Sequence, residues 1–165
     1  MILAVDVDYE GDKACVAGVQ FRQWTDELAV NLYTSRVDDV AYYVSGQFYR
    51  RELPCIMQLF NDHSIDVKTV VVDGFVYLDG DSKPGLGKYL YDAFDGRINV
   101  IGVAKNSFNN IGPKYQILRG QSEKPLYITS VGIELEEAKA VIISMAGPHR
   151  FPDLLKQVDK LCRSN

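Results

Sequence analysis

The sequence predicts an α/β fold in which three antiparallel strands precede alternating helices and parallel strands. Two patterns lead to this fold class. Apolar and β-branched residues alternate with polar ones over residues 3–9, and a second apolar run at residues 14–21 follows a turn at residues 10–13, as in a β-hairpin. Farther along the chain, residues 69–72 form a continuous β-branched run, which is typical of a parallel strand that is covered on both faces.

The next elements follow in order along the chain. A third antiparallel strand is predicted at residues 27–33. Apolar residues at helical spacing predict a helix over residues 51–61, with Pro54 close enough to its start to be tolerated in the first turn. After the strand at residues 69–72, a glycine-rich loop leads to a short helix at residues 88–94.

The last part of the chain completes a strand–helix–strand crossover and adds further elements. Residues 98–103 form a second buried strand, so the helix before them joins two parallel strands. Two more strands are predicted at residues 115–119 and 126–130, and two helices at residues 135–145 and 153–162. With 165 residues and no repeat, low-complexity tract or linker, the whole chain is predicted to be one domain.

Composition excludes several classes of protein. No apolar run approaches the roughly 18 residues that a membrane-spanning helix needs, and Asp6 stands where a signal peptide would have its apolar stretch. We therefore expect a cytoplasmic monomer with no membrane partner. The three cysteines are odd in number and widely spaced, which indicates reduced thiols. A net charge of −4 argues against a nonspecific nucleic-acid coat, although carboxylates that hold cations would also make the total negative.

Two aspartates occupy positions from which they could hold a metal ion. Asp6 lies in the middle of the first predicted strand, where an unpaired buried carboxylate would be costly, so it either reaches solvent or binds a cation. Asp73 ends a buried strand, and open α/β sheets bind ligands at the carboxyl ends of parallel strands. Carboxylates that meet there could bind Mg²⁺ for phosphodiester cleavage. Asp73 also has an ordinary interpretation, because an Asp before Gly is more often a turn former.

Six short blocks follow one another along the chain in an order that is hard to obtain by chance. They are VDVDY at residues 5–9, YVSG with YRRELP within residues 43–54, VDG at 72–74, GVAK at 102–105, KPLYIT at 124–129 and HRFP at 149–152. With these blocks the chain resembles the endonuclease V family, nucleases that recognise inosine, a deaminated base, in nucleic acid. The order of the predicted elements agrees with this resemblance, because it is the order of a ribonuclease H-like mixed sheet flanked by helices.

The resemblance implies roles for individual residues. Asp6, Glu52 and Asp73 would be the metal-binding carboxylates, with Mg²⁺ or Mn²⁺ as the cofactor, and Asp159 is a weaker candidate for the same metal. Lys105 would be the catalytic lysine, whose charge stabilises the nucleophile or the scissile phosphate. Without the resemblance, Glu52 and Asp159 would be read as exposed helix acids, and Lys105 as a strand-end lysine that extends into solvent.

The segment at residues 43–46 resembles the wedge with which the family opens the duplex. An enzyme that reads one modified base must expose the Watson–Crick edge of that base, and an aromatic ring can fill the vacated stack. By this likeness Tyr43, Val44, Ser45 and Gly46 would bind the substrate, and Gly46 and Gly74 would let backbone amides approach the flipped base. The alternative is that Tyr43 and its neighbour Tyr42 form a strand pair packed on the core.

The chain departs from the family pattern at several places. The family wedge commonly has two prolines where this chain has Tyr42 and Ser45, which predicts a less rigid wedge. After Asp73 and Gly74 the family has two histidines, whereas residues 75–79 read FVYLD; Asp79 could replace one histidine or be a turn acid. The chain also begins at the first strand, without the family's N-terminal helix. These differences predict a divergent branch whose substrate could differ.

We therefore expect a metal-dependent endonuclease that cleaves near inosine or another deaminated base in DNA or RNA and leaves a 3′-hydroxyl and a 5′-phosphate. One alternative is a catalytically reduced protein that binds modified nucleic acid; the retained acids and lysine favour an enzyme. A nucleotide-binding or sugar-phosphate enzyme is the third possibility, but the sequence has neither a GxxxxGK[ST] loop nor a GxGxxG fingerprint.

Overall fold

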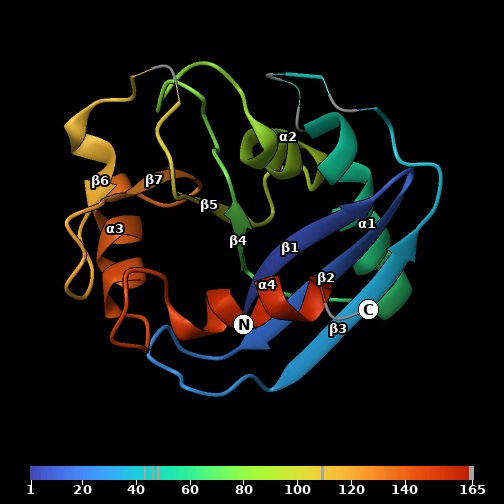
Figure 1. Cartoon of the computed structure of the whole chain (residues 1–165), viewed down its shortest axis with the longest axis horizontal. Helices are drawn as coiled ribbons and strands as arrows, with labels where there is room; N and C mark the ends of the chain where they lie inside the picture. Colours follow the sequence, from blue (N-terminus) through green and yellow to red (C-terminus); the bar gives the residue numbers. More distant parts are fainter. Residues whose placement is uncertain (43, 46, 48, 109, 164–165) are drawn as a thin grey trace.

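The protein forms a seven-stranded mixed sheet with helices on both faces, as seen in a computed structural model that describes residues 1–163 except positions 43, 46, 48 and 109 (Figure 1). The strand order is β3-β2-β1-β4-β5-β7-β6. The strands are β1 (Ile2–Glu10), β2 (Lys13–Phe21), β3 (Asn31–Val37), β4 (Thr69–Asp73), β5 (Asn99–Ala104), β6 (Gln116–Ile117) and β7 (Leu126–Val131). The helices are α1 (Tyr49–His63), α2 (Leu86–Ala93), the short 3-10 helix η1 (Pro113–Tyr115), α3 (Leu135–Ser144) and α4 (Asp153–Arg163).

Strand β1 joins the antiparallel and parallel parts of the sheet. It pairs antiparallel with β2 and parallel with β4, and β4 pairs parallel with β5. The ribonuclease H-like mixed sheet predicted from the sequence is therefore confirmed. Parallel pairing extends less far than predicted, because β7 runs antiparallel to β5, and β6 runs antiparallel to β7. In the described segment between β5 and β7 there is only η1 and β6, not the helical crossover that a parallel pair needs.

Separate cores lie on the two faces of the sheet. Helices α1 and α2 pack on the face formed by Leu3, Val5, Val70 and Val72, among others. Helices α3 and α4 pack on the opposite face, formed by residues that alternate with these. Because successive side chains of a strand point to opposite faces, the residues two positions after Ala4 and Val71 also lie on the face of α4. The sheet thus directs two polar residues, Asp6 and Asp73, toward α4.

Three boundaries differ from the predictions. Strand β3 begins at Asn31 and not at residue 27, because the carboxylate of Asp26 accepts hydrogen bonds from the backbone N–H groups of Arg22 (3.0 Å) and Gln23 (2.9 Å) and holds a turn there. Helix α1 begins two residues earlier than predicted, so Pro54 is its sixth residue and not part of the first turn. The missing N–H of Pro54 then removes one hydrogen bond inside the helix.

The third difference concerns β6, which has two residues where five were predicted. The chain leaves the sheet before Arg119, whose buried guanidinium donates hydrogen bonds to the carbonyl oxygens of Met145 (2.6 Å) and His149 (2.6 Å). These carbonyls belong to the connection between α3 and α4. Arg119 therefore fixes the start of α4 against the sheet, and burial of its charge is compensated by the carbonyls that it binds.

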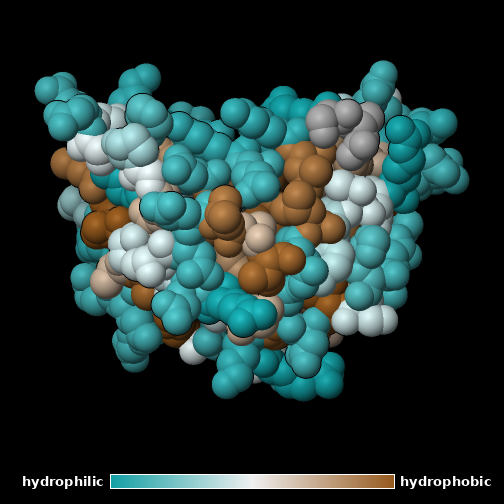
Figure 2. Space-filling view, turned by 90° about the horizontal axis from the view of Figure 1, so that it is seen from below, coloured by the Kyte–Doolittle hydropathy of each residue, from teal (hydrophilic) through white to brown (hydrophobic). Residues whose placement is uncertain are grey.

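The face shown in Figure 2 is mostly polar, with an apolar patch near its middle. Across the described residues, no helix combines the length and the hydropathy needed to cross a bilayer. All three cysteines are buried and none is part of a disulfide, which agrees with the reduced thiols predicted from the sequence.

Candidate active site

Three of the predicted residues meet at one edge of the sheet because of strand register. The parallel pairing of β1 with β4 ends at Val5 and Val72, so the next residues, Asp6 and Asp73, are neighbours. Asp73 in turn pairs with Val103 of β5, and Lys105 lies two residues beyond that partner. Strand β1 continues past the end of β4. Asp6, in the middle of β1, therefore lies beside Asp73, the last residue of β4.

The corner after Asp73 is held by close backbone packing. Gly74 has a φ of 141°, in the range that favours glycine, and its N–H donates to the carbonyl of Val103 at 3.1 Å. A Cβ at Gly102 would lie 2.5 Å from the Gly74 carbonyl oxygen, so a glycine is needed on β5 as well. The hydroxyl of Thr129 accepts a hydrogen bond from the N–H of Val76 at 2.8 Å. The N–H of Gly74 already donates to Val103 and is not available to a bound molecule. The space beside Gly74 is open.

The acid cluster, which we define as Asp6, Glu52, Asp73 and Asp159, draws on four different elements. Asp6 and Asp73 come from β1 and β4, and Asp159 reaches them from α4, where it forms a side-chain hydrogen bond with Asp6. Glu52 comes from α1 on the other face, and its charge interacts with those of Asp73 and Asp6 around the end of β4. All four carboxylates predicted as metal ligands therefore lie in one region.

The pKa values show that negative charge in this cluster is poorly compensated. Burial, followed by the charge of Asp73, raises the pKa of Asp6 to about 7. Burial and the charges of Asp73 and Asp6 raise the pKa of Glu52 to about 8. The pKa of Asp73 is also raised by surrounding protein, although its side chain lies at an open rim that water reaches, and Lys105 opposes this shift. A divalent cation would counteract these shifts, because its charge favours the ionised carboxylates.

Asp159 behaves differently because it has a cationic partner. Burial opposes its ionisation, but hydrogen bonds with Arg163 and Asp6 hold its pKa below the usual range. The Nε atom of Arg163 lies 2.9 Å from Oδ1 of Asp159, and the same guanidinium lies 3.9 Å from Asp8. A metal ion at Asp159 would therefore compete with Arg163 for this carboxylate.

Lys105 stands at the rim of the cluster. Its charge interacts with Asp73 and Asp159, and its Nζ atom lies 4.4 Å from the centroid of the Phe151 ring. The guanidinium of Arg150 donates hydrogen bonds to the carbonyl oxygens of Lys105 and Pro125, the latter at 2.8 Å. Arg150 thus anchors the backbone that carries Lys105. Arg150 lies in one of the blocks that match the family, and no role was predicted for it.

The chemistry of the donor set fits a divalent cation. Carboxylate oxygens are the ligands that Mg²⁺ and Mn²⁺ prefer. In the described part of the chain, one tight group of candidate ligand atoms brings Asp6 and Asp159 together with Cys162, all within 4.8 Å of one another. Cys162 was not predicted, although its spacing of three residues from Asp159 places both on one helix face. Its sulfur is a ligand that Mg²⁺ does not favour.

A cavity of about 260 Å³ opens beside Glu52 and Asp73. We call it the Glu52 pocket; it is lined by Tyr49, Glu52, Asp73, Gly74, Phe75, Leu78, Gly85, Leu86 and Phe108. Apart from the two acids and the glycines, the residues that line it are apolar, and three of these residues are aromatic. Phe75 and Leu78 stand in the segment where the family has histidines. Among the predicted substrate-binding residues, Gly74 lines this pocket.

The predicted wedge is only partly described. Tyr43 and Gly46 lie outside the described residues. Val44 and Ser45 are exposed and are not among the residues that line the Glu52 pocket. Asp79 forms a turn, because its carboxylate accepts hydrogen bonds from the N–H groups of Asp81, Ser82 and Lys83 at 2.9–3.2 Å.

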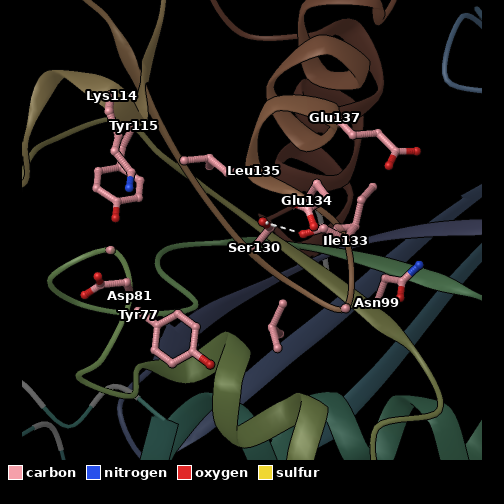
Figure 3. A pocket seen from close by; sticks show the side chains of 13 residues that line it. Tyr77, Asp81, Asn99, Lys114, Tyr115, Ser130, Ile133, Glu134, Leu135 and Glu137 are labelled. Atoms are coloured by element: carbon pink, nitrogen blue, oxygen red, sulfur yellow. Dashed lines mark hydrogen bonds between the residues drawn. The ribbon is translucent and has the colours of Figure 1, made fainter.

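A larger hollow, of about 580 Å³, lies elsewhere, at the start of α3 (Figure 3). It is bordered by Tyr115, Asn99 and Glu134, and the hydroxyl of Ser130 within it donates to the carbonyl of Ile133 at 2.8 Å. It includes no member of the acid cluster. Volume alone would point to this hollow as the candidate active site. The converging carboxylates and their raised pKa values point instead to the smaller Glu52 pocket.

No protein-family model and no curated protein matches the sequence. Solved structures do match the fold. Endonuclease V from Streptomyces avermitilis is 22% identical, with a TM-score of 0.76 over 99% of this chain and 79% of its own. The catalytic domain of human endonuclease V is 22% identical, with a TM-score of 0.76 over 99% of this chain and 80% of its own. Ciona intestinalis endonuclease V, bound to a 23mer DNA containing an inosine, is 16% identical, with a TM-score of 0.81 over 99% of this chain and 83% of its own. The chain has the endonuclease V fold.

Proposed function

We propose that this chain is a divalent-metal-dependent endonuclease that hydrolyses a phosphodiester bond near inosine or another deaminated base in DNA or RNA. The observation that carries the proposal is the convergence of Asp6, Glu52 and Asp73 from three elements, with Lys105 at the rim. Such a concentration of poorly compensated carboxylates destabilises the fold unless a cation binds to it. The likeness to an endonuclease V bound to inosine-containing DNA supports the same class of substrate.

In this proposal Asp6, Asp73, Glu52 and Asp159 hold Mg²⁺ or Mn²⁺. When bound, the ion supplies Lewis acidity at the phosphate. Glu52 either completes the metal site or, as a carboxylate, accepts a proton from the attacking water. The ammonium group of Lys105 offsets the negative charge that grows on the phosphate.

The Glu52 pocket is our candidate for the site that receives the base. Aromatic walls can stack on a base that has left the duplex, and an apolar pocket of this kind excludes water from it. Because two acids of the cluster line the same pocket, a base held there would bring its own phosphate close to the ligands. Tyr43 of the predicted wedge would then fill the vacated stack.

The experiment that tests this function uses labelled single- and double-stranded oligonucleotides with one inosine, incubated with the purified protein in Mg²⁺ or in chelator. We expect nicking near the inosine only with metal, with a 3′-hydroxyl and a 5′-phosphate at the nick. Oligonucleotides with adenosine at the same position are the matched control.

The alternative, a catalytically reduced protein that binds modified nucleic acid, predicts a different result. The segment after Gly74 lacks both family histidines, and its residues Phe75 and Leu78 give the pocket apolar walls, which favours this alternative. Selective binding of inosine without nicking, in Mg²⁺ and in Mn²⁺, would support the binding protein and contradict the enzyme.

A further inference from the structure

A pair of stacked tyrosines stands at the edge of the Glu52 pocket. Tyr49, the first residue of α1, and Tyr89, in α2, have ring centroids 3.9 Å apart and planes inclined by 23°. Tyr49 also lines the Glu52 pocket, and Glu52 follows it by three residues on the same helix face. The ring of Tyr49 therefore belongs both to the stack and to the wall of the pocket.

The geometry of this pair differs from that of the other aromatic pairs nearby. Aromatic pairs in proteins favour offset or edge-to-face arrangements with centroids roughly 4.5–7 Å apart. The rings of Phe75 and Phe108, which also line the pocket, are tilted by 50° and lie 6.2 Å apart. Tyr49 and Tyr89 are closer and nearly parallel, and both are only half-buried. A flat aromatic surface that solvent reaches is the form in which side chains receive a nucleobase.

An exposed arginine accompanies the tyrosines. The Nε atom of Arg50 donates a hydrogen bond to the hydroxyl of Tyr49 at 3.4 Å, and its guanidinium carbon lies 5.9 Å from the centroid of that ring. Arginine beside an aromatic surface attracts the phosphates of a nucleic-acid strand. The acids inside the pocket repel phosphate, so a nucleotide at this edge would turn its base toward the rings and its phosphate toward Arg50.

We propose that Tyr49, Tyr89 and Arg50 bind an unpaired nucleotide of a single strand, with the base stacked on Tyr49 and the phosphate near Arg50. The inference rests on the proposed function, because it assigns this surface to the strand that is cut. Tyr89 is a positioning residue here: it holds the ring of Tyr49 in place and does not itself contact the base. A paired base is stacked within the duplex on both faces, so the site favours single strands.

Binding of a fluorescein-labelled single strand of about ten nucleotides, measured by anisotropy in chelator, tests this inference without turnover. We expect Tyr49→Ala and Tyr89→Ala each to weaken binding roughly tenfold, the range for loss of one stacking contact. Tyr89→Phe keeps the ring and should bind within about twofold of wild type. His63→Ala is the matched control, since it removes a ring partner of Tyr33, 5.1 Å away, at the other end of α1; it should leave binding unchanged.

The salt dependence of binding distinguishes the contribution of the Arg50 charge from that of the stacked tyrosines. Arg50→Ala should reduce the slope of log Kd against log salt by about one, as expected for loss of one phosphate contact. Tyr89→Ala should weaken binding at every salt concentration and leave this slope unchanged. Melting temperatures of all variants, measured in the same buffer, exclude unfolding as the cause, and Tyr49→Ala serves as the second stacking variant if Tyr89→Ala is unstable.

Several results would overturn the inference. They are unchanged binding by both alanine variants, an equal loss for Tyr89→Ala and Tyr89→Phe, and equal affinity of the wild type for single-stranded and duplex probes. Because the probe is bound in chelator, failure of the proposed enzyme activity would not affect this measurement. A protein that nicks with Mg²⁺ but shows no effect of these variants would keep the proposed function and lose the stacking site.

Discussion

Two Asp-Gly pairs lie six residues apart, at Asp73-Gly74 and Asp79-Gly80, and their carboxylates have opposite environments. Asp79 is exposed, and three backbone N–H groups of its own turn, with the hydroxyl of Ser82, hold its pKa below the usual range. Asp73 also reaches solvent, but it has acidic neighbours, and the surrounding protein raises its pKa against the opposing effect of Lys105. The same dipeptide is thus a satisfied turn in one place and part of a charged cluster in the other.

The difference teaches how a structural acid can be told from a functional one. A turn acid finds its hydrogen-bond donors within the next few residues, and its charge is stabilised as soon as that turn forms. An acid in a functional site lies beside acids from other elements of the fold. Its charge is stabilised only when a ligand such as a cation binds. Substitutions at the two positions should therefore have unlike effects on activity, on stability and on pH dependence.

The largest effect is expected for Asp73→Asn, with Asp6→Asn alongside it. Each variant removes a metal-binding charge and no core volume, so nicking should fall by more than roughly a hundredfold while the fold is kept. In chelator the melting temperature should rise slightly, because repulsion of Glu52 is relieved. Nicking assays at saturating Mg²⁺ and thermal melting check this. Near-normal nicking by either variant would show that its carboxylate does not hold the metal.

Lys105→Ala should have the next largest effect. Loss of one electrostatic stabiliser lowers turnover by roughly a hundredfold, with a smaller change in binding. Lys83→Ala is the matched control, because Lys83 approaches Asp79 through its backbone N–H and not its side chain. Single-turnover rates and affinities should be measured for both variants. A Lys105→Ala protein that lost affinity but kept its single-turnover rate would make Lys105 a phosphate anchor.

The pH dependence of stability should be of intermediate size. Asp6 and Glu52 have folded pKa values of about 7 and about 8, above their values of 3.8 and 4.5 outside the fold. In that window the folded state holds more protons than the unfolded state, so the metal-free protein should lose stability as pH rises from ~4 to ~8. Mg²⁺ should weaken this trend, since it stabilises the ionised acids. Thermal melting across that range, in chelator and in Mg²⁺, is the measurement; a metal-free protein whose stability rose with pH would contradict it.

Asp79→Asn should have the smallest effect, although the chemical change is the same as in Asp73→Asn. The amide oxygen still accepts hydrogen bonds in the turn, but more weakly than a carboxylate does. Because the lowered pKa of Asp79 stabilises the fold only above its unfolded value of 3.8, the variant should lose little stability in acid and slightly more at neutral pH. Turnover should stay within about twofold of wild type. A large loss of nicking would give Asp79 the metal-facing role that the family histidines suggested.

Much of the fold could be predicted because its signals are local. The alternation in β1, the apolar run in β2 and the continuous β-branched run in β4 identified these strands within a residue or two. The boundary of β3 could not be predicted in this way, since the turn held by Asp26 directly precedes the predicted strand and delays its start. The direction of β7 was also missed, because local patterns do not record which neighbour a strand pairs with.

The sequence by itself determined the chemical types at the site. An aspartate in mid-strand and another at a strand end were visible from position alone, and the resemblance added Glu52, Lys105 and Asp159. Only the tertiary structure decided that the four carboxylates lie together, that Cys162 lies close to two of them, that Arg150 anchors the backbone of Lys105, and that Tyr49 stacks on Tyr89. The reason is physical: side-chain type and period are fixed residue by residue, whereas these contacts arise where a parallel register and two helices on opposite faces bring distant segments within a few ångströms. Asp73 and Asp79, alike in sequence, differ for that reason.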